Sequence, residues 1–192
     1  MDSHLIDKTV RQYVDGISDQ YYPMTGSVIA VMAAQAAALA EACVQISLDN
    51  QVDKLDWQDV TTRIEQLAHI KSTLLEWSNQ DISTGRTDNP PAADNGNQNA
   101  LFDYAVEIAK LSLEAAEKLQ DFRPMTYASL KDDLEIAVYL LTSTAQTAAL
   151  LLKHNLSTVS NPALTEPYHT ILTDLGQQIN QLAAAQSTRQ PM

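Results

Sequence analysis

An alanine-crowded and almost uncharged run from Ser27 to Leu48 most constrains what this chain can fold into. Alanine is the strongest helix former, and the run contains no proline or glycine, so it predicts one long helix. Small side chains on every face let neighbouring helices approach closely, which is typical of a central core helix or of a dimer interface. The alanines of this run are Ala30, Ala33, Ala34, Ala36, Ala37, Ala38, Ala40 and Ala42.

A short turn, Pro23 to Ser27, leads directly into this helix. Ser27 is the expected N-cap, with its hydroxyl accepting from an early backbone N–H, and Gly26 lets the chain pass close to a ligand. A helix start of this kind offers N–H donors and a positive dipole end to an anionic group. The alternative is that the turn is simply the beginning of a buried helix.

Composition predicts an all-α protein with a single domain over residues 1–192. Alanine and leucine dominate the apolar residues, and there are only two Phe and five Gly. A formal charge of -12 repels phosphate backbones and anionic lipid, so nucleic acid is an unfavourable partner. Cys43 is the only cysteine, which excludes an intrachain disulfide and fits a reducing cytosol.

Neither export nor a membrane span is expected from the sequence. Asp2, Asp7, Asp15 and Asp19 interrupt the first twenty residues, unlike the apolar stretch of a signal peptide. The longest apolar run, residues 28–40, is shorter than the roughly 18 to 20 residues that a membrane span needs. We therefore expect a cytoplasmic protein without a membrane partner.

Apolar residues recur at three- and four-residue spacing in six segments, which predicts a bundle of about six helices. Ser3 is the expected cap of the first helix, Asp56 begins the third, and Ser129 to Asp132 resembles a capping box for the fifth. The sixth starts at Asn161-Pro162 or at Thr165-Glu166-Pro167. The expected ranges are 3–20, 27–48, 56–80, 101–122, 129–153 and from 161 or 165 to about 185.

Residues 83–98 break this periodicity and are crowded with turn formers, which predicts a flexible loop. A loop of this length is either a lid over a site or a solvated connector, and the connector is favoured. A polar C-terminal tail is expected from about residue 186.

The usual catalytic motifs are missing. The histidines at positions 4, 69, 154 and 169 are scattered, and no zinc, nucleotide or serine-hydrolase motif is present, so no metal is expected. What remains is a carboxylate pair, Asp132 and Asp133, at the start of the fifth helix. Two carboxylates in a first turn can simply complement the helix dipole. If the second is desolvated in a cleft, it can instead transfer a proton.

Four segments follow one another in a recognisable order: Leu5 to Asp15, the turn from Pro23 to Val28 with the alanine-rich helix, Lys131 to Ala137, and Asn155-Leu156. This order of segments resembles the cyclodeaminase/cyclohydrolase family. The family includes the C-terminal half of formiminotransferase-cyclodeaminase and the stand-alone methenyltetrahydrofolate cyclohydrolases. The resemblance spans nearly the whole chain and is strongest over residues 5–45.

The resemblance implies a homodimeric helical protein that binds a tetrahydrofolate derivative between helices, without a metal. The reaction would be cyclisation of a formimino group with loss of ammonia, or hydrolysis of a methenyl bridge. Asp133 would be the acid/base residue. Gly26 and Ser27 would line the ligand through backbone N–H groups, and Asp132 and Asn155 would complete the binding residues.

The sequence also departs from the family pattern. Met24 and Thr25 replace two glycines of the turn, and residues 126–129 lack the family's two amide side chains before the Ser-Asp segment. Basic residues for a folate glutamate tail are scarce. Two hypotheses therefore stand: a folate one-carbon enzyme, or a catalytically silent relative that serves as a dimeric helical binding or structural module.

Overall fold

The computed structural model of the protein describes residues 8–19, 24–51, 56–85 and 95–187. These residues form six α-helices and two short 3₁₀ helices, and no strand occurs among them. The predicted all-α class is therefore confirmed. The elements are α1 (Val10–Ser18), α2 (Thr25–Asn50), α3 (Trp57–Gly85), α4 (Asn95–Phe122), η2 (Arg123–Met125), η3 (Ala128–Leu130), α5 (Lys131–Ser157) and α6 (Pro162–Ser187).

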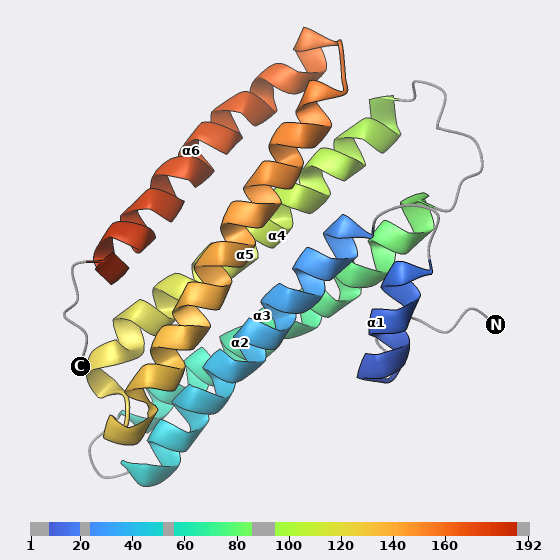
Figure 1. Ribbon diagram of the computed structural model, residues 1–192. Helices are drawn as coiled ribbons and strands as arrows, with labels where there is room; N and C mark the ends of the chain where they lie inside the picture. The colour runs from blue at the N-terminus through green and yellow to red at the C-terminus, as the bar shows by residue number, and fades with distance from the viewer. Residues whose placement is uncertain (1–7, 20–23, 52–55, 86–94, 188–192) are drawn as a thin grey trace.

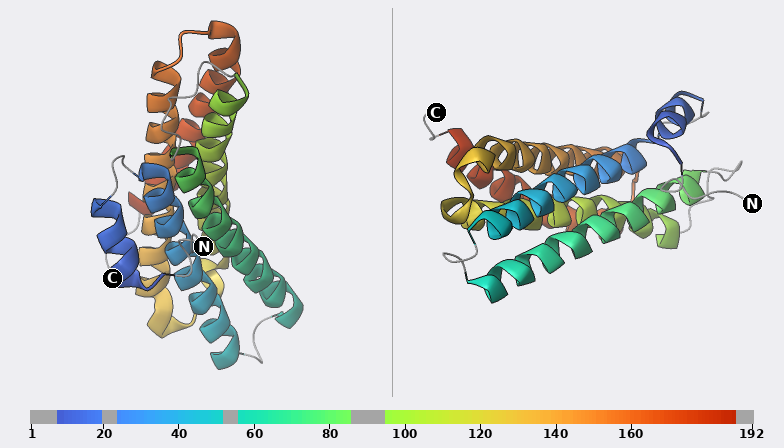
Figure 2. Two further views of the ribbon diagram at one scale, coloured as in Figure 1. Left: turned by 90° about the vertical axis from the view of Figure 1, so that its right-hand side faces the viewer. Right: turned by 90° about the horizontal axis from the view of Figure 1, so that it is seen from below.

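Helices α2 to α5 form an elongated four-helix bundle (Figure 1). α2 packs against α3 and α5, and α4 packs against α5, while α6 lies along the outside of α4 and α5. α1 lies to one side of the bundle, as both views in Figure 2 show, and none of its residues is buried. The core therefore lies between α2, α3, α4 and α5, with α6 closing one side.

The alanine-rich helix is a core helix. This was one of the two interpretations of its sequence. Ala30, Ala33, Ala36, Ala37 and Ala40 are completely buried. Their methyl groups leave room for α3 on one side and α5 on the other. The hydrophobic core that contains these alanines also includes large side chains of the neighbouring helices, among them Leu67, Leu74, Phe122 and Leu141.

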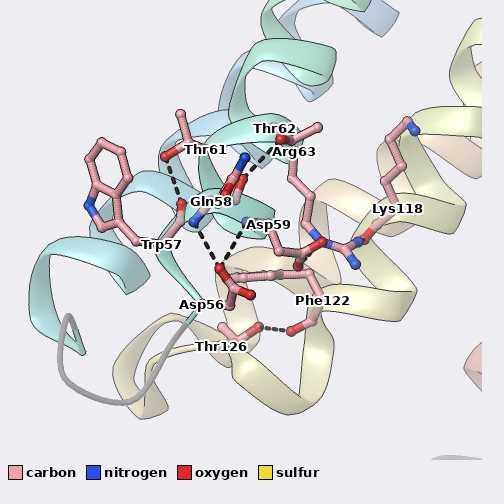
Figure 3. Close-up of polar contacts among 10 residues, drawn as sticks. All are labelled: Asp56, Trp57, Gln58, Asp59, Thr61, Thr62, Arg63, Lys118, Phe122 and Thr126. Carbon is pink, nitrogen blue, oxygen red and sulfur yellow. Dashed lines mark hydrogen bonds and ion pairs between the residues drawn. The ribbon is translucent and has the colours of Figure 1, made fainter.

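The start of α3 follows the sequence prediction. The Asp56 carboxylate accepts from the backbone N–H groups of Gln58 at 3.0 Å and Asp59 at 3.4 Å (Figure 3). Arg63 then pairs with Asp59 at 2.9 Å and donates to the Lys118 carbonyl oxygen at 3.5 Å. This arginine thus ties the first turns of α3 to the last turns of α4.

Several other helix ends differ from the prediction. α3 continues to Gly85 and α4 already begins at Asn95, so both flanks of the expected 83–98 loop are helical, and residues 86–94 lie outside the described residues. The start of α1 is Val10, capped by Thr9 and Gln12 in a capping box, while Ser3 also lies outside the described residues. Side chains can cap a helix wherever geometry allows, so periodicity alone did not fix these ends.

The sixth helix starts at the first of the two predicted positions. The Asn161 side chain accepts from the Ala163 N–H at 3.2 Å, and the helix continues through Pro167 to Ser187. Gln186, near the expected start of the polar tail, is still helical and buried, and its amide donates to the Thr142 hydroxyl at 3.1 Å, while residues 188–192 lie outside the described residues. This contact between α5 and α6 extends the helix beyond its predicted end.

Two helices are long and apolar enough to cross a membrane by length and composition alone, Thr25–Asn50 and Ala128–Ser157. The first continues well beyond the 28–40 run that the sequence singled out. About half of each apolar window is buried inside the protein, 56% and 44%. The core helices of water-soluble bundles pass the same test, so this finding is weak support for a membrane span.

Candidate functional site

The turn before α2 differs from the prediction. α2 begins at Thr25, and Met24 occupies the N-cap position without a side-chain hydrogen bond. Ser27 is therefore not the N-cap; its buried hydroxyl donates instead to the Ser78 carbonyl oxygen in α3, at 2.6 Å. The predicted cap is wrong because α3 packs close enough to offer the hydroxyl an acceptor. Gly26 and Ser27 still lie in the first helical turn, where backbone N–H groups have no intrahelical acceptor.

The Ser27 hydrogen bond leads to a stability prediction. Ser27→Ala removes a buried donor from a contact between two core helices, so we expect it to lower the free energy of unfolding by about 1 kcal/mol. Urea denaturation of the two proteins measures the difference. Ser72→Ala, at an exposed position of α3, is the control and should leave the midpoint almost unchanged. Equal stability of wild type and Ser27→Ala would contradict the structural role.

Asp132 and Asp133 lie in the first turn of α5, as predicted. The predicted capping box is wrong: Leu130 is the N-cap, no side chain bonds there, and η3 leads directly into the helix. Asp132 is exposed and Asp133 partly buried. Burial raises the pKa of the Cys43 thiol to about 11, and the nearby Asp133 carboxylate contributes to that rise. Asp133 therefore lies beside the C-terminal half of α2.

Cys43 provides a chemical test of this packing. The thiolate is the reactive form, and a pKa near 11 keeps the buried thiol protonated at pH 8. We expect Cys43 to react with iodoacetamide far more slowly in the folded protein than in urea, as measured by mass spectrometry. Because the folded protein holds this proton more tightly, the contribution to stability is complete below pH 9 and decreases as pH rises towards 11. Equally fast labelling with and without urea would contradict this burial.

Within one chain, the predicted site residues are far apart. Cys43 follows Ser27 by sixteen positions in α2, which is about 24 Å along a helix. Since Asp133 lies beside Cys43, it does not meet the Gly26–Ser27 turn. Asn155 follows Asp133 by twenty-two positions in α5, or about 33 Å. One copy of the chain therefore places Asp132 and Asp133 at one end of the α2–α5 pair and Asn155 at the other end of α5.

Contacts around Asp133 that the sequence did not suggest hold the start of α5 against α2. The Ser47 hydroxyl donates to the Cys43 carbonyl oxygen at 2.7 Å and accepts from the Tyr127 N–H at 3.0 Å. The Gln51 amide donates to the Met125 carbonyl oxygen at 3.1 Å. These bonds tie the connection between α4 and α5 to the end of α2, and so place Asp133 there. The bonds to Tyr127 and Met125 join residues more than seventy positions away from their partners, so no local sequence signal marks them. Only the bond from Ser47 to Cys43 is local.

An ion pair also joins the turn after α4 to the start of α5. Arg123, in the 3₁₀ turn after α4, pairs with Glu135 of α5. Burial lowers the pKa of Arg123 below its usual value, while Tyr139 acts in the opposite direction. Glu135 and Tyr139 are one helical turn apart on the side of α5 that points away from Asp133. The ion pair therefore holds that side of the helix against the turn after α4.

A groove of about 640 Å³ lies between α5 and α6. Lys153 is the one charged side chain among its lining residues. None of the residues predicted to bind a ligand lines this groove. The lining residues are Ser143, Gln146, Thr147, Ala149, Leu150, Lys153, Leu172 and Thr173.

Within the described ranges, no group of three or more His, Cys, Asp and Glu side chains is arranged to hold a metal ion.

The architecture is that of a cyclodeaminase-type helical bundle. The structure of formiminotetrahydrofolate cyclodeaminase from Thermotoga maritima superposes with a TM-score of 0.80, covering 93% of each chain at 18% identity. This similarity shows the fold. The family model for formiminotransferase-cyclodeaminase matches residues 9–84, from the cap of α1 to the end of α3. No curated protein sequence matches this chain significantly.

The family resemblance predicted from the sequence is thus confirmed. Residues 9–84 are similar to the formiminotransferase-cyclodeaminase family, and the chain has the fold of a cyclodeaminase over nearly its whole length.

Proposed function

We propose that this chain is a folate one-carbon enzyme of the methenyltetrahydrofolate cyclohydrolase or formiminotetrahydrofolate cyclodeaminase type. It would be a single cytoplasmic helical domain that acts as a homodimer, with a small-molecule folate as its partner and neither nucleic acid nor a membrane. The observation that carries the proposal is the family match over residues 9–84, which includes the whole of α2. The similarity of the fold to a cyclodeaminase supports it.

Asp133 would transfer the proton. In hydrolysis of a methenyl bridge, its carboxylate takes a proton from the attacking water and returns it to the folate nitrogen that leaves the bridge carbon. In cyclisation of a formimino group, it would take the proton from the second folate nitrogen as that nitrogen bonds to the formimino carbon, and give it to the amino group that leaves as ammonia. Its position supports this role, because it is partly buried on α5 and still reachable by a ligand from outside the bundle.

Gly26, Ser27, Asp132 and Asn155 would bind the folate, and a homodimer is needed for them to act together. In one chain Ser27 and Asn155 are far from Asp133, as their positions along α2 and α5 require. A second copy related by a two-fold axis can supply the missing half of each site. The site would then lie between copies.

The activity is tested by following 5,10-methenyltetrahydrofolate absorbance with the purified protein, beside an assay for ammonia release from 5-formiminotetrahydrofolate. We expect one of the two signals to exceed the spontaneous rate in proportion to protein concentration. Rates equal to the protein-free blank in both assays would refute the enzymatic proposal.

The second candidate is a catalytically silent relative that keeps the dimeric helical scaffold. It is favoured by the turn before α2, where the Ser27 hydroxyl is engaged by Ser78 and the Met24 side chain is buried in place of a family glycine. This candidate predicts a dimer without turnover. Light scattering at micromolar concentration tests it, and a monomer would be incompatible with it.

A further inference from the structure

The groove between α5 and α6 has the size of a small-molecule site. Its volume of about 640 Å³ falls within the range of about 300–1,000 Å³ that is usual for such sites. None of the residues that we propose for the folate site lines it. Lys153, at one end of the groove, follows Asp133 by twenty positions in α5, which is about 30 Å along a helix. The groove is therefore separate from Asp133.

One wall of the groove is a single face of α5. Ser143, Gln146, Leu150 and Lys153 follow one another at spacings of three and four positions, which places them on the same side of the helix. Leu150 is 64% exposed, and hydroxyl and amide groups lie one turn before it. This wall thus offers an apolar surface with hydrogen-bonding groups at one end and an ammonium group at the other.

The ammonium group of Lys153 has no carboxylate partner among the described residues. Five other basic side chains in the described residues are each held by a carboxylate, although the protein has a formal charge of -12. Lys153 is also the one charged side chain among the residues that line the groove. Charge complementarity therefore favours one anionic group at this end of the groove.

Gly176 continues the groove along α6, which runs beside α5 (Figure 1). Leu172 and Thr173 line the groove from this helix. Successive residues of a helix turn by about 100°, so position 176 points between the directions of these two side chains, one turn further along. A Cβ atom at Gly176 would meet nothing within 4 Å, so this side of α6 is open there.

Nothing in the fold requires a glycine at position 176. No described glycine has a positive φ, and no atom near Gly176 is close enough to exclude a side chain. Glycine is less favourable than alanine in the middle of a helix. Its structural effect here is the space that it leaves beyond Leu172 and Thr173.

We propose that this groove binds a small organic anion with an aromatic body. The Lys153 ammonium group pairs with the anionic group, the aromatic body lies against Leu150 and Leu172, and the space at Gly176 accommodates its far end. A flat, rigid body suits a groove between two helices better than a flexible chain, because it loses less conformational entropy on binding. This site is independent of the proposed folate chemistry.

Two fluorescent probes with the same aromatic rings test the role of the charge. One is 8-anilinonaphthalene-1-sulfonate, and the other is N-phenyl-1-naphthylamine, which lacks the sulfonate. We expect Lys153→Gln to weaken binding of the sulfonate about fivefold, the effect of one solvated ion pair, and to leave binding of the uncharged probe unchanged. Lys153→Arg keeps the charge and should bind both probes like wild type.

Lys110→Gln, at an exposed position of α4, is the control for the loss of a positive charge and should bind both probes like wild type. Equal binding of the sulfonate by Lys153→Gln and wild type would overturn the role of Lys153. Failure of the wild-type protein to bind either probe would overturn the site itself.

Gly176→Leu tests the position of the aromatic body. The leucine side chain would occupy the open space, so we expect it to weaken binding of both probes about tenfold. Gln178→Leu adds the same side chain at an exposed position that points away from the groove, and should bind like wild type. Circular dichroism checks that both variants are folded. Unchanged binding by Gly176→Leu would show that the probes bind elsewhere and would overturn the proposal.

Gly176→Ala tests whether the glycine serves the fold. Because a Cβ atom there meets no other atom, we expect a higher midpoint in urea and nearly unchanged probe binding. A lower midpoint would show that packing requires the glycine, and the argument from Gly176 would fail. Probe fluorescence per chain that falls as protein concentration rises would show that a second copy covers the groove instead, which would also overturn the proposal.

Competition with 5-formyltetrahydrofolate separates this site from the proposed folate site. We expect no displacement of the sulfonate probe, and Lys153→Gln and Gly176→Leu should keep the wild-type rates in both folate assays. Displacement by the folate would overturn the independence of the groove. Absence of turnover by the wild-type protein would refute the proposed function and leave the probe results unaffected, so the two failures are distinguishable.

Discussion

Asp133→Asn is expected to lower the rate of 5,10-methenyltetrahydrofolate turnover by about 10²- to 10⁴-fold, the usual contribution of a general acid–base residue. Asparagine has nearly the same shape as aspartate but neither accepts nor releases the proton that the reaction needs. Since Asp133 is only partly buried at the start of α5, the fold should persist. The measurement is initial rate against substrate concentration, and the loss should fall on kcat.

Asp121→Asn is the matched control, because Asp121 is an exposed carboxylate near the end of α4. It should turn over substrate at the wild-type rate. If Asp133→Asn keeps more than a tenth of the wild-type kcat, Asp133 is not the proton-transfer residue. Equal thermal midpoints for the two variants would establish that any loss is chemical.

Leu74→Ala is expected to destabilise the protein by about 2–5 kcal/mol, the cost of a large cavity in a packed core. Leu74 is completely buried in α3, where it packs in the core cluster that includes the alanines of α2. Alanine side chains cannot move into the vacated space, so the cavity should collapse little. This loss is a large share of the total stability of a typical domain, about 5–15 kcal/mol.

Glu76→Ala, two positions further along the same helix, is the control for helix propensity. Glu76 is exposed, and alanine favours the helix, so its midpoint in urea should stay near that of wild type. If Leu74→Ala and Glu76→Ala unfold at the same urea concentration, α3 does not pack on α2 as described.

Helix type and order could be predicted from the sequence because they depend on local spacing. Val60, Leu67 and Leu74 recur at the helical period, and all three are buried on one side of α3. Caps that use neighbouring residues could also be predicted. The Asp56 carboxylate accepts from residues two and three positions ahead, and the Asn161 side chain accepts from the residue two positions ahead at the start of α6. In each case the capping side chain and the backbone N–H group that it binds lie within four residues of each other in the sequence.

Ser27 illustrates why the rest could not be predicted. Its residue type is right for a cap, yet its hydroxyl donates to Ser78, fifty-one positions away. The burial of Gln186 is similar, since its partner Thr142 lies on another helix. A polar side chain takes the acceptor that packing brings near, and that packing is not encoded in the neighbouring residues.

The sequence by itself determined that this chain forms long helices and that the alanine-rich one is small enough on every face to pack closely against its neighbours. These properties follow from side-chain size and periodicity along the chain. Only the tertiary structure decided that Asp133 lies beside Cys43 and far from Ser27 and Asn155. α2 and α5 run in opposite directions along each other, and long-range bonds such as that between Ser47 and Tyr127 hold them in this register.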